Sequence, residues 1–155
     1  MFRYRPPKEL RALFIIHYAP LLLIILIGPL TAYSGVCEIP FPKLPTILLG
    51  CAIFLLGTYV YFKWEIFWHK TYTGQLVTGG IFQYIRHPHY TSVLIVGFGL
   101  ALFFYSLVAF GIALIAIPIM IWSILDEEKL LTKQYGEPYR EYMKKVPWRM
   151  IPKLF

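Results

Sequence analysis

The sequence predicts an all-α integral membrane protein with about four transmembrane helices and an amphipathic cytoplasmic C-terminal tail. Of the 155 residues, 58% are hydrophobic and only 15% are charged, whereas soluble domains carry roughly 25% charged residues. The apolar residues form long runs, and spans of about 20 residues each would occupy more than half of the chain. We therefore expect a single transmembrane domain over residues 1–155. This composition excludes a disordered chain, a disulfide scaffold and a soluble two-domain enzyme.

The first two spans follow from the first two apolar runs. A span is expected over residues 12–36, because this run is longer than the hydrophobic segment of a signal peptide and no small-residue cleavage site follows it. Pro20 and Pro29 lie within it and predict kinks that neighbouring helices cover. A turn-rich stretch follows, and the second span is expected over residues 44–62. Aromatic and charged residues come directly after it, as at a membrane interface.

The next two spans are predicted to form a hairpin. Residues 91–125 contain no charge, and one straight helix of this length would measure about 50 Å at about 1.5 Å per residue. The hydrocarbon core is only about 30 Å thick, so the chain must fold back near residues 103–106. We expect spans over 88–104 and 107–125. Small residues would let these two helices approach closely; they are Gly97, Gly99, Ala101 and Gly111.

The distribution of charge predicts the orientation in the membrane. Fifteen Lys and Arg against eight Asp and Glu give a net charge of +7, which in a soluble protein would suggest nucleic-acid binding. Here every Lys and Arg except Lys43 falls in the N-terminal arm, in residues 63–86 or after residue 125. By the positive-inside rule, these segments and both termini are cytoplasmic. We expect the membrane as partner, with no nucleic acid and no obligate protein partner evident.

Chemistry-bearing residues gather first in the loop at residues 71–90, TYTGQLVTGGIFQYIRHPHY. Pro88 suits the first turn of the following helix, which places His87 near the N-cap. The free N–H groups of a helix N-terminus attract anions, and Arg86, His87 and His89 add donors or charge there. The same residues also fit ordinary roles at an interface, such as a snorkelling arginine and a capping histidine. Both interpretations stay open on this segment alone.

A second cluster consists of Asp126, Glu127 and Glu128, directly after the fourth expected span. Three consecutive carboxylates repel one another and call for compensation. The hairpin would bring them level with the basic loop, as either an ion-pair network or a polar site for a zwitterionic ligand. The tail over residues 126–155 is amphipathic and interrupted near Gly136. It could anchor the protein to anionic lipid or cover a cofactor.

The segment LVTGGIFQYIRHPHY, a helical hairpin and then DEEKLLTKQYGEPYREYMKKVPWRMIP closely resemble the isoprenylcysteine carboxyl methyltransferase family and its prokaryotic relatives. The resemblance covers residues 74–152, about half of the chain. It implies an integral membrane enzyme that binds S-adenosyl-L-methionine at the cytosolic face and methylates a lipid-borne or hydrophobic acceptor, which in that family is a carboxylate. Direct in-line methyl transfer to an ionised carboxylate needs no general base.

The resemblance also implies the site residues. The cofactor contacts would be Gly74, Gln75, Leu76, Val77, Phe82, His87, Pro88, His89, Tyr90 and Glu127. His87 with the helix N-terminus would meet the cofactor carboxylate, and Glu127 its ammonium or ribose hydroxyls. Glu128 and Arg149 are expected on the substrate side as catalytic residues, and no metal is expected. For an amine or thiol acceptor, Glu128, His89 and His87 are the candidates for a general base.

Two departures from the family pattern leave the acceptor open. Ser123 stands where the eukaryotic carboxyl methyltransferases have an arginine that meets the substrate carboxylate, and Phe82 replaces a tyrosine. Phospholipid amine methyltransferases are the nearer alternative and differ mainly in the acceptor. Sterol reductases share the RHPxY element and the tail pattern, but they use NADPH and are much longer. Metal chemistry is disfavoured, since the chain has only four histidines.

Overall fold

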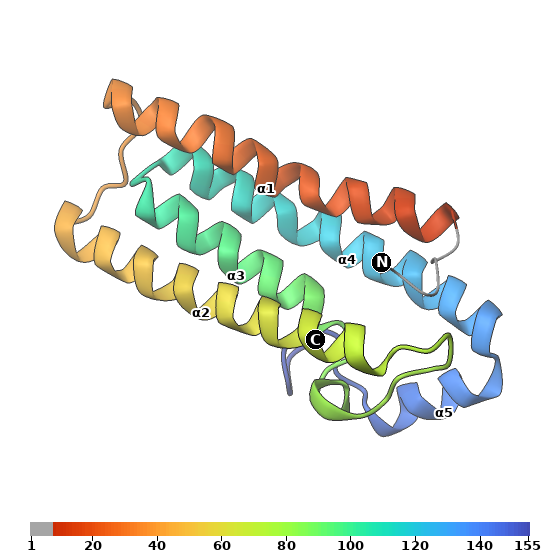
Figure 1. The fold of residues 1–155 in the computed structure, drawn as a ribbon. Helices are drawn as coiled ribbons and strands as arrows, with labels where there is room; N and C mark the ends of the chain where they lie inside the picture. The colour runs from red at the N-terminus through yellow and green to blue at the C-terminus, as the bar shows by residue number, and fades with distance from the viewer. Residues whose placement is uncertain (1–7) are drawn as a thin grey trace.

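The structure, a computed structural model, describes residues 8–155, and part of the basic N-terminal arm lies outside the described residues. The described chain is helical, as Figure 1 shows, and the prediction of an all-α membrane protein is confirmed. Its elements in order are α1 (Lys8–Ser34), α2 (Lys43–Thr71), the 3-10 turn η1 (Gly80–Gln83), α3 (Pro88–Phe103), α4 (Leu107–Tyr135) and α5 (Glu137–Lys145).

Within the described residues, three helices are long and apolar enough to cross a membrane, namely α1 from Ile16, α2 and α4. Helix α3 is apolar but has only 16 residues, about 24 Å at about 1.5 Å per residue. Helix α2 continues past the expected span end to Thr71, and α4 continues to Tyr135. The acidic cluster therefore lies on α4 rather than after it. The helix ends only where Gly136 takes a φ of +64°, which glycine adopts readily.

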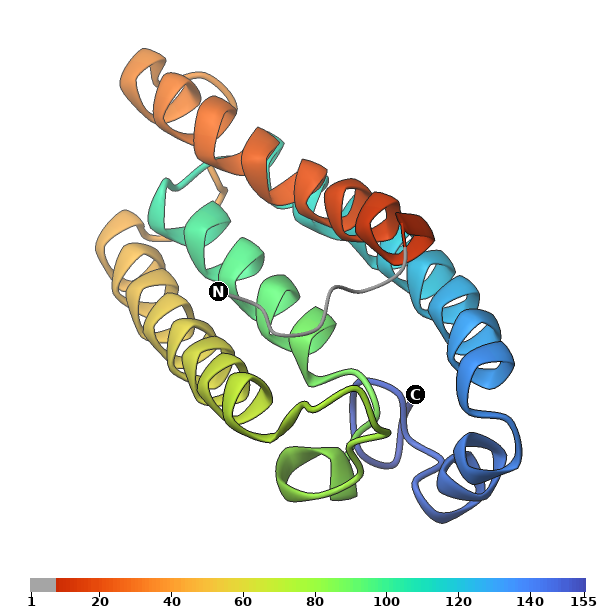
Figure 2. The ribbon, with the colours of Figure 1, turned by 45° about the vertical axis from the view of Figure 1, so that its right-hand side comes forward.

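Helices α1 to α4 lie side by side, with α3 between α2 and the α1–α4 pair (Figures 1 and 2). Helix α2 packs mainly along α3, and α1 mainly along α4. Helix α5, η1 and the C-terminal residues gather at one end of this bundle. We call it the site end, because it holds the sequence-predicted loop and acidic cluster.

Glycines create a close contact of α2 with α3, which the sequence did not predict, in addition to the expected packing of α3 with α4. A Cβ on Gly99 would lie 2.6 Å from Cα of Phe54 on α2, and one on Gly57 would lie 2.8 Å from the backbone nitrogen of Val96 on α3. At Gly111 a Cβ would meet nothing within 4 Å. The expectation that Gly99 and Gly111 join α3 to α4 was therefore wrong, and Gly97 faces Ile24 of α1. The expectation for Ala101 was right, because it lies in a buried cluster with Ala109 and Ala113 of α4 and with Ile24.

The turn between α3 and α4 lies at the end opposite the site. Ser106 caps α4 by accepting a hydrogen bond from the backbone N–H of Ala109 at 3.1 Å. Thr31 of α1 donates to the Ser106 hydroxyl at 2.7 Å, and the Leu107 N–H donates to the Cys37 carbonyl at 2.8 Å. These bonds tie the first connection to the hairpin turn and hold the bundle closed at this end.

Candidate functional site

The site end is built where the start of α3 meets the C-terminal residues. The backbone N–H of Arg86 donates to the carbonyl of Trp148 at 2.9 Å, and that of His87 donates to Arg149 at 2.8 Å. One turn later the Thr91 hydroxyl donates to the Met150 carbonyl at 3.0 Å. The C-terminal segment is thus hydrogen-bonded along the first turn of α3. This pairing presents Arg86 and His87 to the last turns of α4.

Glu128 lies at the centre of a buried ion network. Its Oε1 accepts hydrogen bonds from Arg86 Nε at 2.9 Å and Arg86 Nη2 at 2.6 Å, and it lies 3.2 Å from His87 Nε2. Its Oε2 accepts from Arg149 Nε at 3.1 Å. The side chains of Arg86 and Glu128 are only 4% and 9% exposed. We call these four residues the Glu128 network; it fastens α4 to the loop and to the tail.

His87 lies between two carboxylates. Its Nδ1 is 3.6 Å from Glu127 Oε2, and its Nε2 faces Glu128. Burial alone would disfavour the charged imidazole, but hydrogen bonds and charge from Glu127 and Glu128 raise the pKa of His87 above its ordinary value. This environment favours the protonated imidazole of His87. Asp126 takes no part in this arrangement, because it pairs with Lys129 on the exposed side of α4 at 2.8 Å.

The loop residues that were expected to contact a cofactor divide into two groups. Leu76 and Val77 are partly buried and pack against a buried cluster that includes Phe82, whereas Gln75 is exposed. Gly74 has a φ of +95° and forms the turn that leads into this stretch. These apolar residues border a cluster that joins α2, η1 and α5, which we call the loop cluster. It consists of Trp64, Phe82, Tyr139, Tyr142 and Val146.

Two polar atoms of the loop cluster have unmet hydrogen-bonding capacity. Trp64 Nε1 and the Tyr139 hydroxyl are buried and have no hydrogen-bond partner among the described residues. Tyr142, by contrast, donates to the Phe82 carbonyl at 2.7 Å. Burial raises the pKa of Tyr139, and the charges of Glu128 and Glu127 raise it further, so its hydroxyl stays a donor. Leaving a buried donor unpaired costs about 1–3 kcal/mol, which indicates a place for a polar ligand beside Glu127.

His89 points into the bundle, whereas Tyr90 also faces the acidic cluster: its ring lies edge-on to His87 at 5.7 Å between centroids, and its side chain interacts with Glu127. His89 Nε2 lies 2.9 Å from Nε2 of His17 on α1, and both imidazoles are buried. The His89 ring packs on Trp64 at 4.5 Å between centroids. Tyr90 is 3% exposed and packs with Val93 and Met120, among others. Pro88 is fully buried at the start of α3.

Sequence reasoning missed His17, Trp64 and Tyr139 as members of this site. His17 lies within a long apolar run on α1, and nothing in its neighbourhood marks it as a partner of His89. The scarcity of histidines is the one signal that could have drawn attention to it. Among the described residues, no group of three or more His, Cys, Asp or Glu is arranged to hold a metal ion.

Comparison with known proteins identifies similar chains. A family model described as phospholipid methyltransferase matches residues 45–138. The chain is 32% identical over 77 residues to the protein-S-isoprenylcysteine O-methyltransferase of Schizosaccharomyces pombe, covering 46% of this chain and 31% of that protein. It is 27% identical over 129 residues to a Delta(14)-sterol reductase of Arabidopsis thaliana, covering 72% of this chain and 35% of that protein.

A Delta(14)-sterol reductase of Methylotuvimicrobium alcaliphilum is 35% identical over 94 residues, covering 56% of this chain and 21% of that protein. The chain thus spans about a third or less of the length of these curated relatives. The family match includes the whole of α3 and α4 and most of α2. It does not include α1, and therefore not His17, nor the segment around Arg149.

Proposed function

Because the chain belongs to the phospholipid methyltransferase family, we propose that it is a membrane methyltransferase that uses S-adenosyl-L-methionine. The acceptor is a hydrophobic or lipid-borne molecule, and the site end faces the cytoplasm. The observation that carries the proposal is the buried arrangement of His87 between Glu127 and Glu128, next to the unpaired donors of Trp64 and Tyr139. A ligand with carboxylate, ammonium and hydroxyl groups matches this set of donors and acceptors.

The proposed cofactor contacts follow the chemistry of each group. His87, whose pKa is raised by Glu127 and Glu128, meets the cofactor carboxylate at the start of α3. Glu127 meets the ammonium or the ribose hydroxyls. The remaining proposed contacts come from the loop and from the start of α3; they are Gly74, Gln75, Leu76, Val77, Phe82, Pro88, His89 and Tyr90. When bound, the cofactor supplies a methyl group activated by its sulfonium charge.

Aromatic side chains favour such a charge, since ring faces attract cations. Trp64 and Phe82 belong to the loop cluster and carry such faces beside the proposed contacts. The enzyme's further contribution is to exclude water and to align donor and acceptor, which lowers the entropic part of the barrier. A buried site at the membrane boundary suits both tasks.

Glu128 and Arg149 have different proposed roles on the acceptor side of the site. Both carboxylate oxygens of Glu128 accept from cations, so we assign it as a positioning residue that orients His87. Arg149 donates to Glu128, packs over the Phe155 ring at 5.1 Å and keeps 30% of its side chain exposed. It is placed to meet an anionic group of the acceptor, such as a phosphate or a carboxylate.

Calorimetry on the detergent-solubilised protein tests the proposal. S-adenosylmethionine and its demethylated product should bind, and NADPH should not. His87→Ala and Glu127→Gln should each weaken cofactor binding about tenfold or more, because a hydrogen bond to a charged group contributes about 1.5–3 kcal/mol. Glu137→Gln is the matched control, since Glu137 pairs with Arg140 on the exposed face of α5, and it should keep the wild-type affinity.

Two outcomes would contradict the proposal. Binding of NADPH without S-adenosylmethionine would favour a reductase, as two of the similar proteins are sterol reductases. Unchanged cofactor affinity in both His87→Ala and Glu127→Gln would remove the site assignment while leaving the reaction class standing.

A further inference from the structure

Residues 149–155, which we call the tail loop, fold back on themselves at the site end. The chain reverses at Lys153, whose φ of +67° lies in the left-handed region, and a residue with a side chain adopts that region at a cost. The backbone oxygen of Phe155 is thereby returned to the start of the loop. It accepts hydrogen bonds from three successive N–H groups, those of Arg149 at 2.9 Å, Met150 at 2.8 Å and Ile151 at 3.1 Å. Successive N–H groups that converge on one oxygen form a concavity of the kind that binds anions.

This concavity is held in place from its other side. The carbonyl oxygens of the same three peptide units accept hydrogen bonds from residues at the start of α3, namely Arg86, His87 and Thr91. A peptide unit is planar and trans, so its N–H group points away from the partner of its carbonyl group. The three N–H donors therefore keep their direction when Phe155 moves away, and they can then receive another oxygen.

Arg149 adds a positive charge at the same place. Its Nε donates to Glu128 at 3.1 Å, which leaves the other N–H groups of its guanidinium for a second acceptor. The guanidinium lies over the Phe155 ring, 5.1 Å from the centroid, and 30% of the Arg149 side chain is exposed. The guanidinium and the backbone N–H groups together form an anion site that lies against Phe155.

The Phe155 ring fills an apolar place next to this anion site. It packs against a buried cluster that joins α3, α4 and the tail loop; the members are Tyr90, Val93, Met120, Ile124 and Met150. Tyr18 and Leu21 of α1 pack against the same cluster, near the start of the span that begins at Ile16. The neighbouring Leu154 is 74% exposed, so the tail loop lies at the surface of the bundle, where an apolar molecule can approach it.

Tyr90 connects this place to the proposed cofactor contacts. Its side chain interacts with Glu127, and it also belongs to the buried cluster on which Phe155 packs. A molecule in the place of Phe155 therefore lies against the cluster that contains this tyrosine, next to the proposed cofactor contacts.

We propose that the place filled by Phe155 is the binding site of the methyl acceptor, and that the acceptor displaces Phe155 from it. The acceptor is an anionic amphiphile. Its carboxylate or phosphate takes the position of the Phe155 backbone oxygen, and its apolar part takes the position of the ring. This inference rests on the proposed function and adds to it the residues that bind the acceptor.

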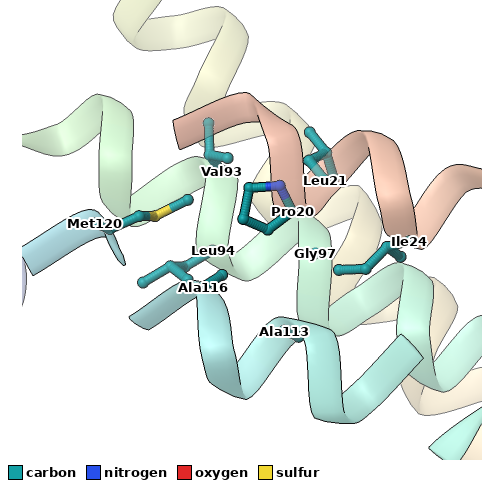
Figure 3. A pocket seen from close by; sticks show the side chains of 9 residues that line it. All are labelled: Pro20, Leu21, Ile24, Val93, Leu94, Gly97, Ala113, Ala116 and Met120. Atoms are coloured by element: carbon teal, nitrogen blue, oxygen red, sulfur yellow. The ribbon is translucent and has the colours of Figure 1, made fainter. Parts of the chain in front are cut away.

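The space required is that of the Phe155 residue itself. The nearby cavity between α1, α3 and α4 is lined by apolar side chains only, among them Pro20, Ile24 and Met120 (Figure 3). It has room for about one water-sized probe and is not part of the proposed site. An acceptor and Phe155 therefore compete for one place, and the apparent affinity for the acceptor falls with the fraction of molecules in which Phe155 occupies it.

The test is a calorimetric titration of the whole chain in dodecyl maltoside with three probes of equal chain length, namely decanoate, decyl phosphate and decanol. Each titration is compared with the same micelles without protein. The wild type should bind decanoate or decyl phosphate, and the tighter of the two identifies the anionic group. Decanol should show only its partition into the micelles, because it carries no charge for the anion site.

Substitutions separate displacement from a merely structural role of the tail loop. Phe155→Ala removes the competing ring and should lower the Kd of the bound anion about three- to tenfold. Leu154→Ala is the matched control, since this neighbouring side chain is mostly exposed, and it should keep the wild-type Kd. Arg149→Gln should raise the Kd about tenfold or more, because it removes a charged donor.

Backbone amide spectra of the ¹⁵N-labelled wild type locate the bound anion. Decanoate or decyl phosphate should shift the signals of Arg149, Met150 and Ile151, whose N–H groups exchange one oxygen for another. The amide signal of His87 should move less, because its bond to the Arg149 carbonyl persists. This readout needs neither cofactor nor activity.

The inference is overturned if Phe155→Ala leaves the Kd unchanged or raises it, if decanol binds as tightly as the anions, or if the three amide signals do not move. These failures leave the binding of S-adenosylmethionine intact. Absence of S-adenosylmethionine binding to the wild type would instead defeat the proposed function, and with it the assignment of the bound anion as a methyl acceptor.

Discussion

Glu128 shows how one residue joins three separate parts of the chain. It is on α4, yet it bonds Arg86 of the loop, His87 at the start of α3 and Arg149 of the tail. Arg86 in turn donates to the carbonyl of Val146 at 2.6 Å. Removing one partner from such a buried set leaves the others without charge compensation.

We therefore predict that Glu128→Ala lowers the free energy of unfolding by about 3–5 kcal/mol, the range found for breaking a buried ion pair. Unfolding of the purified protein in detergent, followed by circular dichroism, measures the loss. Glu137→Ala is the control, because its pair with Arg140 is more than half exposed on both sides and should contribute less than about 1 kcal/mol. Equal effects of the two substitutions would show that the Glu128 network does not hold the tail.

The loop and the acidic cluster were predictable as neighbours, because a hairpin returns the chain to the level at which it entered. The pairing of each acidic side chain with a particular basic side chain could not be predicted. Asp126 turns to the exposed face of α4, whereas Glu127 and Glu128 turn inward. That division depends on the cluster being a continuous part of α4, whereas the hydropathy of the sequence predicted only where the span ends, at residue 125.

At the scale of elements, the contact of α2 with α3 is set by glycine. Gly50, Gly57 and Gly99 let the two backbones approach to distances that a methyl group would prevent. This close packing holds α3 in place, and α3 in turn carries His87 and His89. Small residues commonly mediate such approaches between membrane helices.

Gly99→Ala tests this contact. An added Cβ would meet the backbone of Phe54, so we predict a loss of about 1–3 kcal/mol, as for overpacking in a core. Gly111→Ala is the matched control, since nothing lies within 4 Å of the new methyl group, and it should be neutral or stabilise by up to about 1 kcal/mol. Thermal unfolding of both variants measures the difference in their stability. If Gly99→Ala were as stable as Gly111→Ala, the close α2–α3 contact would be refuted.

At the scale of the whole molecule, exposed apolar side chains cover the outer surface of the bundle. Leu26, Leu30, Leu55 and Ile115 are each more than half exposed, as is expected where lipid replaces water. The helices therefore form a multi-pass membrane protein with a polar site at one end. Cys37, an exposed free cysteine, lies in the connection at the other end.

Charge asymmetry predicts which side of the membrane each end faces. We expect Cys37 to react with a membrane-impermeant maleimide in intact cells, because its connection carries only Lys43 whereas the site end is rich in Lys and Arg. Cys37→Ser should abolish the labelling. In that background, Lys144→Cys on α5 should be labelled only after permeabilisation. The reverse pattern would contradict a cytoplasmic site.

The sequence by itself determined the membrane class, the helical hairpin and the presence of basic and acidic residues at one level, because hydropathy and charge are read along the chain. The tertiary structure decided which helix faces meet. Gly99 faces α2 rather than α4, and His17 reaches His89 across the bundle. A membrane helix that is apolar around its whole circumference carries no periodic signal of its inward face, so its rotation is settled only by packing against its neighbours.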